Sequence, residues 1–174
     1  MGPVGGEPDA HPSITSSPRY ASHELLAWLG VHTNLRPVRI FPGLIKRSPV
    51  KPEVITDVDI MIIRDAAAGL YYGQPRGIST EDGILQAVNT LSYTESQVER
   101  VARLAFEASL SRRKHVTLAD WSKLLETGEL WRQVCTQVAA DYPQVRFELM
   151  DTDTCVLELT WHPHRVDVVL AESS

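Results

Sequence analysis

The segment IIRDAAAGLYYGQPRG, residues 62–77, joins an apolar strand to a turn-rich stretch of chain. Its first residues belong to the apolar run at 60–63. That run lacks polar alternation, so both faces of the strand are expected to be buried, as in a sheet covered by helices. The second half begins with β-favouring residues and is interrupted by Gly73, Pro75 and Gly77. This pattern favours an extended arm with a turn over a strand packed inside a sheet.

Upstream of this segment the sequence changes from a tail to a folded domain. Residues 1–20 are rich in Pro, Gly and Ser and show no apolar periodicity, which indicates a flexible tail followed by one domain over 21–174. Apolar spacing at 25–29 predicts a short helix that ends at Gly30. Apolar residues at 38–41 predict a strand before a Pro-Gly turn.

Downstream, a long helix is expected to begin at a capping box. Thr94 and Gln97 have the types and spacing of that motif. Apolar residues then recur at helical spacing as far as Ala108. The cations at 112–114 follow and would favour the negative end of the helix dipole.

The remaining third of the chain alternates between strands and a helix. A strand is expected at 116–118 and a helix over 124–138. Alternation at 145–149, and a less perfect one at 156–159, predicts two more strands, and 165–170 a buried one. The pattern predicts a mixed α/β fold with more strands than one βαβ unit needs.

Composition excludes several classes of function. The 174 residues carry a net charge of -5 and no basic stripe, which argues against a nucleic-acid partner. The apolar runs are too short for a membrane span, and the N-terminus lacks the pattern of an export signal. The only cysteines, Cys135 and Cys155, have no metal-ligand spacing and are expected to be reduced thiols of a cytoplasmic protein.

Several blocks of the sequence together resemble the isopropylmalate/isocitrate dehydrogenase family of β-decarboxylating hydroxyacid dehydrogenases. The blocks include NLRPVRIFPGL (34–44), IIRDAAAGLYYGQPRG (62–77), VNTLSYTESQVERVARLAFEAS (88–109) and RRKHVTLADWSKLLETGELWRQV (112–134). The resemblance implies the small domain of that fold, a sheet with covering helices. It also implies an extended β-arm around 70–77 that clasps a second copy in a homodimer.

The resemblance also implies a site for a substrate with carboxylate groups. Arg36, Lys46 and Arg64 fall on three carboxylate-binding positions, although Lys46 replaces the usual Arg and loses its bidentate fork. The alternative is that all three are ordinary surface cations. Tyr71 matches a proton-donating tyrosine, or is a residue packed on the dimer arm.

Other positions depart from the family pattern. Trp121 stands where the family has its catalytic Lys, and Lys123 where it has Asn. Indole cannot relay protons, so the sequence predicts no oxidation of a hydroxyl and an apolar pocket wall instead. Asp153 matches a metal-binding aspartate that is expected here to act as a general base, or to form a turn with Asp151. No metal site and no nicotinamide cofactor are expected, because neither sufficient ligands nor a GxGxxG turn occurs.

These features led to the expectation of a cofactor-independent, non-redox enzyme. Its reaction would be of the cyclase, dehydratase, isomerase or decarboxylase type, on a biosynthetic substrate with a carboxylate or enolate, in a pocket at the dimer interface. The alternative is a non-catalytic interaction domain that homodimerises or regulates a full-length dehydrogenase. Trp121 disfavours a dehydrogenase completed by a separate nucleotide domain.

Overall fold

The computed structural model describes residues 25–26 and 28–173, within two compact units that span 1–32 and 33–174. In the first unit Leu25 and Trp28 are helical, and the Leu29 N–H donates to the Leu25 carbonyl at 2.9 Å. Gly30 follows with φ at 65°. The predicted short helix ending at this glycine is confirmed. The predicted tail at 1–20 lies outside the described residues.

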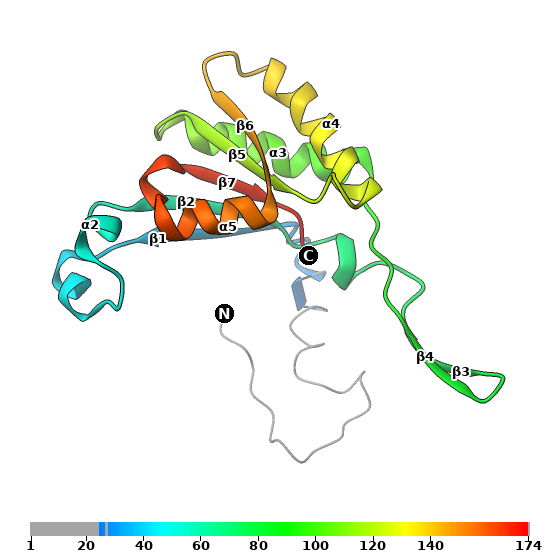
Figure 1. The fold of residues 1–174 in the computed structure, drawn as a ribbon. Helices are drawn as coiled ribbons and strands as arrows, with labels where there is room; N and C mark the ends of the chain where they lie inside the picture. The colour runs from blue at the N-terminus through cyan, green and yellow to red at the C-terminus, as the bar shows by residue number, and fades with distance from the viewer. Residues whose placement is uncertain (1–24, 27, 174) are drawn as a thin grey trace. The chain divides into compact units, whose positions relative to one another are not determined.

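The second unit is built on a five-stranded mixed sheet in the order β1-β2-β7-β5-β6 (Figure 1). β1 pairs antiparallel with β2, whereas β2, β7, β5 and β6 are parallel to one another. The strands are β1 (Thr33–Arg39), β2 (Asp59–Asp65), β5 (His115–Asp120), β6 (Arg146–Asp151) and β7 (Val168–Ala171). The expected mixed α/β fold is confirmed.

Helices cover both faces of this sheet (Figure 1). The long helices α3 (Glu95–Leu110) and α4 (Glu126–Ala140) pack on one face, and α5 (Thr152–Trp161) packs on the other. Short helical turns lie in the connections: η2 (Pro42–Arg47), α2 (Pro52–Ile55), η3 (Gly69–Tyr71) and η4 (Pro163–Arg165).

Two apolar cores follow from this layering. The larger lies between the sheet and the α3–α4 pair and includes Ile63, Phe106, Leu118, Trp131 and Leu170, all almost fully buried. The smaller lies under α5 and contains Val58, Ile60, Ala119, Cys155, Val166 and Val169. Because β2 contributes to both cores, the expectation that this strand is buried on both faces is confirmed.

The predicted capping box at the start of α3 is present. The Thr94 hydroxyl accepts a hydrogen bond from the Gln97 N–H at 3.4 Å, and the Gln97 side chain accepts one from the Thr94 N–H at 2.9 Å. The far end of α3 differs from the prediction. Arg112 lies beyond Leu110, the last residue of α3, and pairs with Asp59 of β2 at 2.8 Å and with Asp167, directly before β7, at 2.9 Å.

The strand expected at 156–159 is wrong, because this segment belongs to α5. Cys155 and Leu159 face the sheet, while Val156 and Leu157 are exposed although they are apolar. A helix with apolar residues on both its inner and outer sides has no clear 3.6-residue pattern, so its sequence is easily taken for a strand.

The predicted arm at 70–77 is also corrected. Residues 69–71 form η3, and the extended element follows as a hairpin of β3 (Gly77–Glu81) and β4 (Ile84–Val88), which projects away from the sheet (Figure 1). Both turn residues, Asp82 and Gly83, have positive φ, the geometry of a tight Asp-Gly hairpin turn. Every residue of the two strands is exposed.

Within residues 25–26 and 28–173, no helix is long and apolar enough to cross a lipid bilayer.

Candidate functional site

Most of the predicted site residues come to one edge of the sheet. The four parallel strands all end at this edge, and the antiparallel β1 begins there. Arg36 lies in β1, Arg64 in β2, and Tyr71 in the turn that follows β2. Trp121 directly follows β5, and Asp153 lies in the first turn of α5 after β6. The carboxyl ends of parallel strands are a frequent position for ligand sites.

Arg36 and Arg64 share one face of the sheet. Asn34 lies opposite Arg64 in the β1–β2 register, and Arg36 is two residues further along β1, so all three side chains point to the same side. Arg36 Nε donates to Asn34 Oδ1 at 2.9 Å. Arg64 is half-buried, and its Nε is buried without a hydrogen-bond partner in the described part of the chain. The two arginines therefore occupy diagonal positions on neighbouring strands.

Tyr71 is positioned by a tightly packed turn. Gly69 has φ at 73°, and a Cβ at this position would lie 2.3 Å from both the Tyr93 and the Ser173 hydroxyl oxygens. Ser173 also donates from its hydroxyl to the Ala68 carbonyl at 2.7 Å. Burial raises the pKa of Tyr93 to about 12, so this hydroxyl stays protonated. Tyr71, which is 44% exposed, thus lies in a turn that is hydrogen-bonded to Ser173, just beyond β7.

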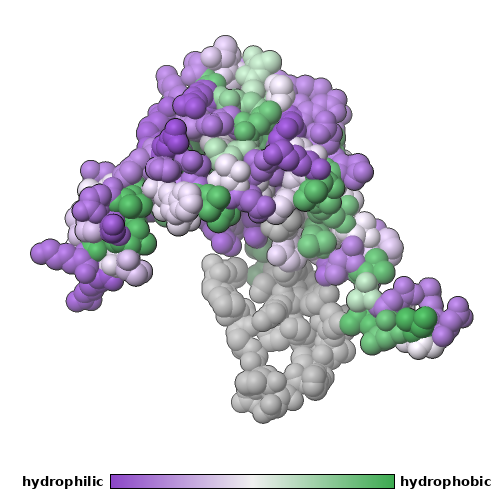
Figure 2. Space-filling model, in the orientation of Figure 1, coloured by the Kyte–Doolittle hydropathy of each residue, from purple (hydrophilic) through white to green (hydrophobic). Residues whose placement is uncertain are grey.

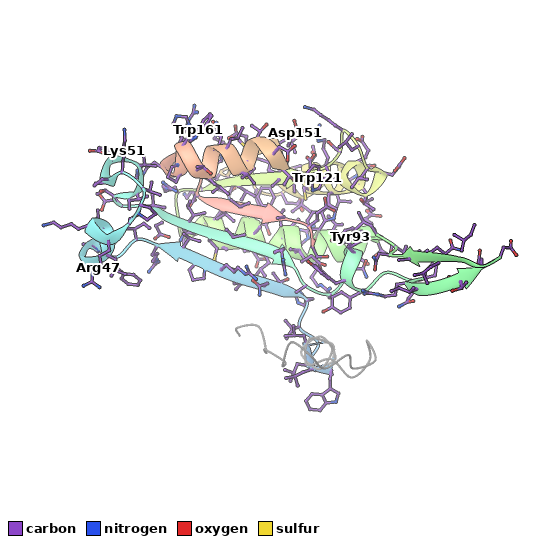
Figure 3. All side chains as sticks on the ribbon, turned by 60° about the horizontal axis from the view of Figure 1, so that its bottom comes forward. Arg47, Lys51, Tyr93, Trp121, Asp151 and Trp161 are labelled. Carbon is purple, nitrogen blue, oxygen red and sulfur yellow. The ribbon has the colours of Figure 1, made fainter. Side chains whose placement is uncertain are left out.

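The turn after β5 holds Trp121 and Lys123. The Trp121 carbonyl accepts hydrogen bonds from the next turn, including one from the Leu124 N–H at 2.9 Å. The Lys123 ammonium contacts Asp151 Oδ2 at the end of β6. Trp121 is half-buried, and Figure 3 shows it on the same side of the molecule as Asp151. These residues thus form a second group at the edge.

A row of carboxylates crosses the same edge, and of its members only Asp151 was noted from the sequence. Asp120 and Asp151 are paired in the β5–β6 register. Arg64, Ala119 and Ala171 are aligned across β2, β5 and β7. The next residue along the chain in each case is Asp65, Asp120 and Glu172, respectively. Asp65, Asp120 and Glu172 each end an apolar segment (IIRD, HVTLAD and VVLAE), a signal that could have identified them.

The members of this row differ in how they are stabilised. Arg132 Nε and Nη2 both lie 3.1 Å from Asp120 oxygens, a bidentate pair. Asp65 accepts the Ala68 N–H at 2.9 Å, yet burial raises its pKa. Glu172 is 4% exposed, and neither of its carboxylate oxygens has a partner among the residues the structure describes. Burial, with Asp120 as a second cause, raises the pKa of Glu172 to about 7.

Two predicted residues do not join these groups. Lys46 lies on η2, beyond the opposite end of β1. Its neighbour Arg47 lies at one end of the molecule in Figure 3, whereas Trp121 lies near the middle. Asp153 is exposed at the start of α5 and belongs to neither the arginine pair nor the row. Across residues 25–26 and 28–173 no group of three His, Cys, Asp or Glu side chains could hold a metal ion.

Comparisons with known proteins place the whole chain in one family. A family model described as "Isocitrate/isopropylmalate dehydrogenase" matches residues 1–173. The chain is 40% identical over 173 residues to the 3-isopropylmalate dehydrogenase of Anaeromyxobacter dehalogenans (strain 2CP-C), covering 99% of this chain and 49% of that protein. It is 41% identical over 175 residues to the enzyme of the same name from Gloeobacter violaceus, covering 99% and 48%. The chain therefore spans about half the length of these relatives.

A solved structure has the same fold. The isocitrate dehydrogenase from Methylococcus capsulatus matches 99% of this chain and 46% of its own chain, with a TM-score of 0.77 and 26% sequence identity. This match confirms the expected likeness to the dehydrogenase fold.

The relatives correct the function expected from the sequence. They are named dehydrogenases, and the chain resembles them along nearly its whole length. The expectation of a cofactor-independent, non-redox enzyme, based chiefly on Trp121, is therefore wrong. Cyclase, lyase, isomerase and pseudo-dehydrogenase interpretations have no support from these proteins.

Proposed function

This chain belongs to the isocitrate/isopropylmalate dehydrogenase family, and from that membership we propose that it binds the substrate of a dehydrogenase. The proposed substrate class is that of 3-isopropylmalate, the molecule in the names of its relatives. Such a hydroxy acid has two carboxylates, one hydroxyl and a branched alkyl group. A site for it needs fixed cations for the carboxylates and an apolar wall for the alkyl group.

The arginine pair carries the proposal. Arg36 and Arg64 lie on one face of neighbouring strands, and the Arg64 Nε is buried without a hydrogen-bond partner in the described residues. A buried guanidinium N–H is costly to leave unsatisfied, and a carboxylate is the acceptor that matches it best. We assign the two guanidinium groups to the substrate's carboxylates. Lys46 would reach this substrate only across the length of β1, so its role is subordinate in this proposal.

Trp121 and Tyr71 have the side chains that the rest of the substrate needs. An indole face beside the cationic edge would contact the branched alkyl group and exclude water from it. The Tyr71 phenol can donate a proton to an oxygen that gains charge during reaction. Lys123, in contact with Asp151, supplies a further cation at the same edge, and Asp153 a further carboxylate.

Oxidation of a hydroxyl also requires an acceptor for the hydride, commonly a nicotinamide cofactor. The described residues do not fit such a cofactor by themselves. The turns after β2 and β5 carry no GxGxxG motif, and β6 runs directly into α5. They also do not form a metal site. The proposal for this chain is therefore limited to binding, orienting and protonating the substrate.

We also propose that the chain forms a homodimer in the cytoplasm. Val156, Leu157 and Trp161 expose an apolar face of α5, and the β3–β4 hairpin is exposed on both sides. Apolar surfaces of this kind favour burial against a second copy. Cys135 and Cys155 are buried and free, which supports a reducing compartment.

Calorimetry with 3-isopropylmalate tests the substrate proposal. The chain is expected to bind it saturably, and Arg64→Gln is expected to weaken binding ~10–100-fold, because one charged hydrogen-bonded contact is lost. Arg146→Gln is the matched control, since Arg146 is an exposed arginine at the opposite edge of the sheet. Equal binding by wild type and Arg64→Gln would contradict the assignment.

A further inference from the structure

A groove lies on the α5 side of the sheet, away from the carboxyl edge. Its floor is formed by β1 and β2 and its walls by α2 and α5, with a volume of about 380 Å³. The lining residues are Val38, Ile40, Val50, Val54, Ile55, Val58, Ile60, Ile62, Leu159, Thr160 and Pro163.

The groove has almost no capacity for hydrogen bonds from its side chains. Thr160 supplies the one hydroxyl in the lining, and this hydroxyl already donates to the Val156 carbonyl at 2.8 Å. The other lining side chains are aliphatic. A polar group placed here would lose its water without compensation, so the part of a ligand that enters must be hydrocarbon.

A second hollow of about 320 Å³ adjoins the groove, and its lining combines apolar side chains, such as Phe41 and Leu44, with two arginines. The two share Ile40 and Ile55, and the second is also lined by Arg39 and Arg47. Arg39 pairs with Asp59 at 3.2 Å, whereas Arg47 has no ion pair with a side chain in the described ranges. Figure 3 shows Arg47 and Lys51 at the same end of the molecule.

Charge is unbalanced around this hollow. The segment 42–55, which carries η2 and α2, has the cations Lys46, Arg47 and Lys51 against one acid, Glu53. In Figure 2 hydrophobic side chains lie beside hydrophilic ones on the part of the surface formed by this segment. An aliphatic groove beside a hollow that contains Arg47 is complementary to a molecule with a hydrocarbon tail and an anionic head.

We propose that this groove binds an aliphatic carboxylate of about eight to ten carbons. The hydrocarbon chain lies between α2 and α5 on the floor of β1 and β2, and the carboxylate pairs with Arg47. The groove borders the arginine pair, because Ile62 in its lining lies opposite Arg36 in the β1–β2 register. The carboxylate is assigned to Arg47, so the proposal does not require that the arginine pair bind 3-isopropylmalate.

Titration calorimetry on the full chain tests the proposal with hexanoate, octanoate and decanoate below their micelle concentrations. Affinity is expected to rise about fourfold for each added methylene, because about 0.8 kcal/mol accompanies the burial of each one. A nonyl trimethylammonium salt, with the same alkyl chain as decanoate and the opposite charge, is expected to bind at least ~10-fold more weakly than decanoate.

Variants separate the tail and head contacts. Val54→Asp in the groove is expected to abolish decanoate binding, while Leu124→Asp, an exposed leucine elsewhere, leaves it unchanged. Arg47→Gln is expected to weaken decanoate about 10-fold, and Arg146→Gln not at all. If Val54→Asp fails to fold, Thr160→Glu places a carboxylate at the exposed rim of the same groove and is expected to have the same effect.

Three outcomes would overturn the proposal. One is the absence of saturable decanoate binding, and another is an affinity that does not change with chain length. The third is binding that survives both Val54→Asp and Thr160→Glu, which would indicate adsorption to exposed apolar surface, or to a dimer face on α5, instead of occupancy of the groove.

Discussion

Tyr93 and Ser173, far apart in the sequence, are joined by two hydrogen bonds. The Ser173 N–H donates to the Tyr93 hydroxyl at 2.8 Å, and the two hydroxyl oxygens lie 3.0 Å apart. Because the Ser173 hydroxyl donates to the Ala68 carbonyl, Tyr93 donates to Ser173. This chain of bonds connects the start of α3, the end of β7 and the turn that carries Tyr71.

Removing the Tyr93 hydroxyl is expected to destabilise the protein. Tyr93→Phe leaves the buried Ser173 N–H without an acceptor, at a cost of ~1–3 kcal/mol in the free energy of unfolding. Urea denaturation measures the difference. Ser173→Ala removes the other hydroxyl but keeps the N–H. In a double-mutant cycle, the losses of unfolding free energy caused by Tyr93→Phe and Ser173→Ala are expected not to be additive. Additive effects would contradict a coupled pair.

Gly69→Ala is expected to be more damaging than the equivalent change at Gly43. At Gly69 the backbone has φ at 73°, and an added Cβ would overlap the Tyr93 and Ser173 hydroxyls at 2.3 Å. Left-handed backbone strain and overpacking together cost ~2–5 kcal/mol. At Gly43 no atom lies within 4 Å of the added Cβ, so the unfolding free energy should change by less than ~0.5 kcal/mol. Equal losses at both sites would refute the packing argument.

Glu172 is expected to make stability fall as pH rises. Burial raises its pKa from 4.5 to about 7 in the folded protein, so the folded state holds a proton that the unfolded state has released between these values. Stability is therefore full below about pH 4.5 and is lost as pH rises through about 7. Asp65, whose pKa is also raised by burial, acts in the same direction.

Glu172→Gln tests this dependence. Between pH 5 and 8 the wild type is expected to lose on the order of 3 kcal/mol of unfolding free energy through ionisation of Glu172. The neutral amide cannot ionise, so the variant is expected to gain stability relative to the wild type as pH rises from 5 to 8. Denaturation curves at both pH values for wild type and variant give the comparison. An identical pH slope in the two proteins would show that Glu172 does not titrate in this range.

The homodimer is expected to depend on the outer face of α5. Light scattering at micromolar concentration should give about twice the chain mass of 19.4 kDa. Leu157→Glu combined with Trp161→Glu should give a folded monomer, because both exposed apolar side chains would carry the interface. Leu124→Glu, also an exposed leucine but located after β5, is the control. A monomeric mass for the wild type in this measurement would contradict the proposed homodimer.

The sequence predicted elements that depend on local patterns. The capping box at Thr94 and the doubly buried strand at 60–63 follow from residue type and periodicity, and both are present. α5 was missed because its outer face is apolar as well as its inner face, so the periodicity that identifies a helix is absent.

The candidate site was predictable only in part. Arg36 and Arg64 were found through the resemblance of their motifs to the family, and the β1–β2 register brings them together. The carboxylate row and the Tyr93–Ser173 pair were not predicted, since they join residues from distant segments whose proximity depends on strand order. Buried polar contacts of this kind leave no periodic pattern in a sequence.

The position of β7 has a consequence for synthesis of the protein. It follows all the other strands along the chain, yet it lies in the centre of the sheet, between β2 and β5. Until it is made and inserted, the β1–β2 and β5–β6 pairs expose unpaired apolar edges to each other and to other chains. A nascent chain that pauses before residue 168 is therefore vulnerable to aggregation, and chaperones that cover open strand edges should reduce that aggregation.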